Sequence, residues 1–181
     1  MRILLASLLT AVALFFFGFI WWGVLMPIVR PASVITDQAL VEQMTESLAG
    51  SALYLYPDYS EENPSGPMAI LFYNAAMPSM ASTMGMGFAH MFVSALLVSL
   101  FVSYAPLRTY FSRVGFVFCL GLFVAIWADV GNLIWWRHPP QWAAFHFGYD
   151  ALSWLLAGLI IAAIVQPRWY KRDMEGDPKV P

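Results

Sequence analysis

Residues 113–136, RVGFVFCLGLFVAIWADVGNLIWW, and residues 142–165, WAAFHFGYDALSWLLAGLIIAAIV, decide the fold. Each run is apolar over more than the roughly 20 residues that an α-helix needs to cross a bilayer core of about 30 Å. Only RHPPQ, residues 137–141, separates the two runs. A connection this short places consecutive helices side by side and antiparallel. The two runs therefore predict a transmembrane helical hairpin.

Two further apolar runs, Ile3–Met26 and about Met84–Tyr104, have the same length, so four spans are expected. The chain of 181 residues is 60% hydrophobic and only 11% charged, against roughly 25% charged residues in soluble domains. This composition indicates an integral membrane protein. A net charge of -2 argues against a nucleic-acid partner, because phosphate contacts need clustered Lys and Arg. The single cysteine, Cys119, excludes an intrachain disulfide.

Basic residues near the ends of the spans predict the orientation, because they favour the cytoplasmic side. With the N-terminus inside, only Arg30 and Arg137 lie outside, so we expect both termini in the cytoplasm and residues 27–83 on the extracytoplasmic side. The first run exceeds the roughly 7–15 residues of a signal-peptide core and lacks an Ala-x-Ala site, which favours an uncleaved signal anchor. The cytoplasmic basic residues are Arg2, Arg108, Arg113, Arg168, Lys171, Arg172 and Lys179.

Residues 27–83 predict a small extracytoplasmic cap of one helix and one β-hairpin. Leu40, Met44 and Leu48 recur every four residues among polar side chains, as in an amphipathic helix, with Thr36 as its N-cap. The apolar runs 51–56 and 68–73 flank a loop rich in Pro and acidic residues, which is typical of a hairpin. An isolated two-stranded hairpin is marginal in water, so this one needs a partner. The expected organisation is span 1 (1–26), cap (27–83), spans at 84–105, 113–136 and 142–166, and a cytoplasmic tail (167–181).

Polar side chains lie inside the hairpin at matched distances from its turn. Asp129 and Asp150 are six and eight residues from Trp135 and Trp142, which places them roughly 9–12 Å inside the hydrocarbon. Ionisable residues in membrane spans usually face the interior of the bundle. We therefore expect the two carboxyls to converge and, if they are close, to share one proton. The expected intramembrane cluster consists of Asp129, Asn132, His146, Asp150, Tyr149 and His90.

Several interpretations of this cluster remain open. It can form a hydrogen-bonded clamp between helices, a pathway for protons or a small solute, or a ligand or lipid site in an outer-leaflet crevice. A metal or haem site is a further alternative, because imidazole and carboxylate together suit zinc or iron and thioethers select Cu(I). A spacing such as HxxxH is absent, so no cofactor is predicted. The candidate metal ligands are His90, His146, Met84 and Met86.

The sequence also resembles a group of known proteins in its pattern of Trp, Gly and polar residues. The pattern comprises GFIWW (18–22), WADVGN (127–132), Trp135-Trp136, Tyr149-Asp150 and WLLAG (154–158). It is similar to small four-span bacterial inner-membrane proteins of unknown function. The resemblance implies a bacterial inner membrane and a similar topology. It implies no activity, and no functional residue is carried over.

Together these patterns predict an all-α membrane protein: a bundle of four transmembrane helices with a helix and β-hairpin inserted between spans 1 and 2. Neither a Gly-x-Ser-x-Gly turn nor a glycine-rich phosphate loop is present, so no catalytic residue is predicted. We expect a non-catalytic accessory or scaffold subunit that binds a larger membrane assembly. Its expected partners are the lipid bilayer and other membrane subunits or a second copy. The alternatives are a proton-linked small-solute carrier using Asp129 and Asp150, or a metal- or haem-binding protein using His90 and His146.

Overall fold

The computed structural model describes residues 1–57 and 67–167, and the predicted tail beyond residue 167 lies outside them. Two compact units are present, residues 33–82 and the remainder of the chain. The first part of the larger unit is a continuous helix formed by α1 (Arg2–Gly18), the π-helical segment η1 (Phe19–Leu25) and α2 (Met26–Val29). It continues with α4 (Met80–Tyr104), α5 (Tyr110–Ala125), the π-helical segment η2 (Ile126–Val130), α6 (Gly131–Trp135) and α7 (Pro140–Ile164).

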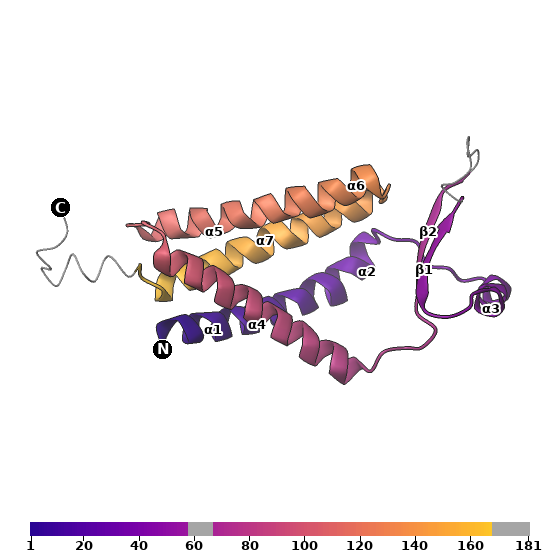
Figure 1. Ribbon diagram of the computed structural model, residues 1–181, viewed down its shortest axis with the longest axis horizontal. Coiled ribbons are helices and arrows are strands. Elements are labelled where there is room, and N and C mark those ends of the chain that lie inside the picture. The colour runs from indigo at the N-terminus through magenta and orange to yellow at the C-terminus, as the bar shows by residue number, and fades with distance from the viewer. Residues whose placement is uncertain (58–66, 168–181) are drawn as a thin grey trace, which may run out of the picture. The chain divides into compact units, whose positions relative to one another are not determined.

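Four helical stretches of the described residues are long and apolar enough to cross a membrane (Figure 1). They are Arg2–Val29, Met80–Tyr104, Tyr110–Trp135 and Pro140–Ile164. The second, third and fourth begin earlier in the chain than the sequence predicts, at Met80, Tyr110 and Pro140 rather than at residues 84, 113 and 142. Pro140 starts the fourth stretch because proline is well accommodated in the first turn, where its missing N–H has no helical partner.

Helix α7 is the central element of the larger unit and packs against both α5 and α1. Small residues allow the close approach to α5: a side chain on Gly158 would lie 3.1 Å from the carbonyl oxygen of Val114. The buried core draws on all four helical stretches and contains Ala6, Leu14, Val98, Val102, Val117, Ala157, Ile161 and Val165. One apolar core thus unites the four helices.

The ends of α5 and α7 that lie far from the α6–α7 turn are joined by polar contacts to backbone. The guanidinium of Arg113 donates from Nε and Nη2 to the carbonyl oxygen of Ala162, at 3.2 and 3.1 Å. The hydroxyl of Tyr110 donates to the carbonyl of Leu159, at 3.1 Å. Ala162 is among the last four residues of α7, whose carbonyls lack intrahelical donors, so the Arg113 contact satisfies a group that would otherwise be unpaired. Both contacts hold the two helices in register.

Helix α4 is buried in the larger unit through its C-terminal half, while in its N-terminal half Phe88 contacts Phe15 of α1, with ring centroids 5.7 Å apart. Every buried residue of α4 lies between Ala95 and Ser103. Ser99 accepts a 3.4 Å hydrogen bond from Ser7 of α1. The N-terminal half diverges from α1 in Figure 1, and its side chains are exposed or only half-buried.

The smaller unit contains α3 (Gln38–Ser47) and an antiparallel hairpin of β1 (Ala52–Tyr56) and β2 (Ala69–Tyr73). The helix and the two strands occur where the sequence predicts them. The N-cap differs, because Asp37 rather than Thr36 accepts from the backbone N–H groups of Ala39 and Leu40, at 3.0 and 3.3 Å. An aspartate next to the first helical residue is among the most effective N-caps, and its side chain reaches both donors.

Candidate functional site

The turn between α6 and α7 positions the candidate site, and we call this end of the larger unit the turn end. The carbonyl oxygen of Asn132 accepts from the backbone N–H groups of Trp136 and His138, at 3.1 and 3.2 Å. Arg137 between them adopts a left-handed conformation with φ 54°. Asn132 thus contributes through its backbone, which closes the turn, while its side chain is half-buried.

Asp129 lies in η2 and is only 7% exposed. Its Oδ2 atom is buried and makes no hydrogen bond to any residue that the structure describes. Single π-helical turns are frequent at functional sites, and here the wider turn contains the buried carboxylate itself. A buried polar group without a partner costs about 1–3 kcal/mol. This carboxylate is therefore a feature that stability alone does not explain.

His146 lies in an aromatic cluster rather than beside Asp129. Its ring centroid is 4.8 Å from that of Trp22 in η1 and 4.4 Å from that of Trp142. Its buried Nε2 atom has no hydrogen-bond partner among the described residues. Tyr149, one turn further along α7, stacks on Phe17 with ring centroids 5.7 Å apart and an interplanar angle of 8°. The cluster joins η1 to the first half of α7.

Asp150 connects the carboxylate side and the aromatic side of the site. It is half-buried and interacts electrostatically with both Asp129 and His146. His138 in the turn interacts electrostatically with Asp129 and His146. Four of the predicted cluster residues, Asp129, His146, Tyr149 and Asp150, thus lie together at the turn end.

His90 occupies a different environment from the rest of the predicted cluster. It is exposed on the N-terminal half of α4, at roughly 15 Å from Met80 for a rise of about 1.5 Å per residue. Met84 is half-buried and Met86 is 64% exposed on the same half-helix. Within residues 1–57 and 67–167, no three His, Cys, Asp or Glu side chains are grouped so that they could hold a metal ion.

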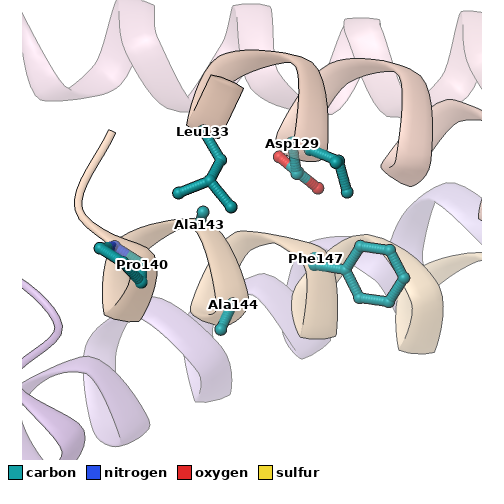
Figure 2. Close-up of a pocket in the computed structure, with 7 residues that line it drawn as sticks. Asp129, Leu133, Pro140, Ala143, Ala144 and Phe147 are labelled. Atoms are coloured by element: carbon teal, nitrogen blue, oxygen red, sulfur yellow. The ribbon is translucent and has the colours of Figure 1, made fainter. Parts of the chain in front are cut away.

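A cavity of about 260 Å³ adjoins Asp129 between η2, α6 and the start of α7. Figure 2 shows the Asp129 carboxylate on one wall, directed toward α7, with Leu133 beside it and Ala143 and Phe147 on the facing helix. The other lining residues are Val130, Pro140 and Ala144. One acidic group therefore meets an otherwise apolar, partly open cavity.

Sequence reasoning missed three elements of this site: the two π-helical segments, the cavity, and the role of Trp22. Trp22 appears in the sequence only as part of the GFIWW pattern, whereas in the structure it packs on His146 and also on Tyr149, the latter with ring centroids 5.3 Å apart. The spacing of Trp21-Trp22 before Pro27 contains no signal that identifies the α7 partners. Comparison of the chain with protein-family models, curated proteins and solved structures finds no match.

Proposed function

We propose that the chain is a multi-pass protein of the bacterial inner membrane, folded as a four-helix bundle with both termini in the cytoplasm. In this orientation residues 27–83 and the turn end are extracytoplasmic. Exposed large apolar side chains on all four long helices support the membrane location, among them Phe16, Phe101, Phe123 and Leu152. The distribution of basic residues supports the orientation.

Within that membrane, we propose that the protein is an accessory subunit that binds another membrane protein through α4. The observation that carries this proposal is the exposure of His90 well inside an apolar spanning helix. Ionisable side chains within membrane spans almost always face protein or water, because exposure to hydrocarbon is costly. A partner helix with a hydrogen-bond acceptor opposite His90 removes that cost. Met86, Val93 and Leu97, all at least half exposed, form the rest of this α4 face.

Cross-linking from single cysteines tests the α4 face in native membranes. In a Cys119→Ala background, Met86→Cys and Val93→Cys are expected to give adducts several-fold more abundant than Phe123→Cys. Phe123 on α5 is the matched control, because its side chain is 63% exposed and that of Met86 is 64% exposed. His90→Leu should reduce the adducts from Met86→Cys. Equal labelling of α4 and α5 positions would contradict the proposal, and a homodimeric adduct would replace the partner by a second copy.

A second candidate function, a proton-linked small-solute carrier, is favoured by the pairing of Asp129 with Asp150. Asp129 is buried without a hydrogen-bond partner among the described residues and interacts electrostatically with Asp150. Two such carboxyls together can bind and release a proton. The half-buried state of Asp150 leaves it the more accessible of the two. Exchange of one proton between the pair and the extracytoplasmic side would link proton movement to occupation of the cavity.

Proton flux in proteoliposomes tests the carrier function. The purified chain should dissipate an imposed pH gradient, read by an entrapped pH-sensitive dye, several-fold faster than protein-free vesicles. Asp150→Asn is expected to lower this rate at least tenfold while the protein stays inserted, because the amide cannot exchange a proton. Glu42→Gln, a change of the same type on the exposed face of α3, should have no effect. A wild-type rate equal to that of empty vesicles would refute the carrier.

A further inference from the structure

The cavity at the turn end has the composition of a binding site rather than of a packing defect. A packing defect inside a protein is lined by apolar groups, whereas this cavity contains a carboxylate. Asp129 is 93% shielded from solvent, since it is 7% exposed, and its Oδ2 atom has no partner among the described residues. In Figure 2 the carboxylate points across the cavity toward α7. A ligand with a hydrogen-bond donor would complete this site.

The charges around the cavity favour a cationic donor. Asp150, which lies in α7, interacts electrostatically with Asp129 in η2, so two carboxyls act on the same region. His138 in the turn interacts electrostatically with Asp129, and Asp150 interacts electrostatically with His146. An anion placed at Asp129 would be repelled by both carboxylates, whereas an ammonium group would be attracted by both. Charge-assisted hydrogen bonds to a carboxylate are also about twice as strong as neutral ones.

The remaining walls limit the size and polarity of the ligand. Six of the seven lining residues are apolar, and Phe147 presents a ring to the cavity opposite Asp129 (Figure 2). Aromatic rings stabilise ammonium groups through cation–π interactions. The volume of about 260 Å³ is below the range of roughly 300–1,000 Å³ of sites for drug-sized molecules. The ligand is therefore a small molecule with one cationic group on a compact apolar body.

We propose that the Asp129 cavity binds a small apolar ammonium ion, with the nitrogen donating to Asp129 Oδ2 and the hydrocarbon body against Leu133, Ala143 and Phe147. This inference rests on the second candidate function, whose solute it assigns to a chemical class. Ligand binding and proton movement are separate properties of the site. Each is measured separately, so that either proposal can fail alone.

Calorimetric titration of the purified, detergent-solubilised full chain with benzylamine tests the inference. Benzylamine is expected to bind at least tenfold more tightly than benzyl alcohol, which has a similar shape and no charge. Asp129→Asn should weaken benzylamine binding at least tenfold, whereas Glu42→Gln should leave it unchanged. Equal affinities for the amine and the alcohol, or unchanged amine binding to Asp129→Asn, would overturn the proposal.

A second variant keeps the test valid if Asp129→Asn fails to fold. Ala144→Leu leaves the carboxylate intact and fills the cavity, so benzylamine binding should fall at least tenfold. Ala163→Leu, also an exposed alanine of α7 but far from the cavity, is the matched control and should bind as wild type. Equal binding by both variants would show that the amine binds elsewhere. Benzylamine binding without proton flux would refute the carrier alone, and flux without binding would refute this inference alone.

Discussion

Replacing Gly121 with leucine is expected to destabilise the protein strongly. Gly121 is buried in α5 at its contact with α7, and a Cβ atom there would overlap Cβ and Cγ of Trp154. The overlap involves the root of the Trp154 side chain, so a change of rotamer at its far end cannot relieve it. Overpacking a close-packed core costs about 1–3 kcal/mol and occasionally more. We expect a loss at the upper end of this range, measured as a lower midpoint of unfolding in detergent.

Gly115 provides the matched control for this substitution. It lies six residues earlier in the same helix, and no neighbouring atom lies within 4 Å of the position of its Cβ. Gly115→Leu should be neutral or slightly stabilising, because leucine favours the helix over glycine. Combining Gly121→Leu with Trp154→Ala should destabilise less than the sum of the two single changes, because they share one contact. Equal effects at Gly121 and Gly115 would contradict the close packing of α5 on α7.

Trp22→Ala is expected to cause the second large loss of stability. The ring of Trp22 contacts those of Trp142, Phe145, His146 and Tyr149 at centroid distances of 6.1, 5.3, 4.8 and 5.3 Å. Aromatic pairs contribute about 0.5–1.5 kcal/mol each beyond the area they bury, so removal of the ring should cost about 3 kcal/mol. The same variant should release η1 from the start of α7. Thermal unfolding followed by circular dichroism measures the loss.

Trp135→Ala is the control, since the Trp135 side chain is 79% exposed at the same end of the larger unit. It should change stability by less than about 1 kcal/mol, as expected for an exposed position outside a packed cluster. His146→Phe is informative beside it. Phenylalanine keeps a ring between Trp22 and Trp142 and removes the buried Nε2 atom that has no partner. If Trp22→Ala and Trp135→Ala were equally mild, the aromatic cluster would contribute little to the fold.

The four long helices follow directly from the sequence, because length and apolarity are local properties. Around Met80 the sequence is less decisive, since Met-Ala-Ser-Thr is neither strongly apolar nor helix-breaking, and α4 begins four residues before the predicted Met84. At residue 140 the sequence contains the relevant signal, a proline that starts a helix, whereas hydropathy places the boundary at Trp142. Boundaries depend on a few hydrogen bonds at the helix ends, which hydropathy does not report.

The distance of Asp129 and Asp150 from the α6–α7 turn also follows from counting residues, because the rise of a helix is constant. The rotation of each helix about its own axis cannot be obtained by counting residues. His146 and Asp150 are separated by one turn of α7, yet His146 packs on Trp22 of η1 while Asp150 is coupled to Asp129 of η2. The sequence placed His90 in the same cluster by depth alone. It lies instead on the exposed half of α4.

Length, apolarity and residue spacing are local properties, and they suffice to locate the apolar helices, the hairpin of the smaller unit, and the distance of each polar residue from the α6–α7 turn. Which helix faces contact one another depends on packing between helices and is seen in the fold alone. Apolarity that extends around the whole helix leaves its rotation open, and the contact of Gly121 with Trp154 or of Trp22 with His146 selects one rotation through packing. The cavity beside Asp129 depends on that packing, because its walls come from η2, α6 and α7 together rather than from any local pattern of residues.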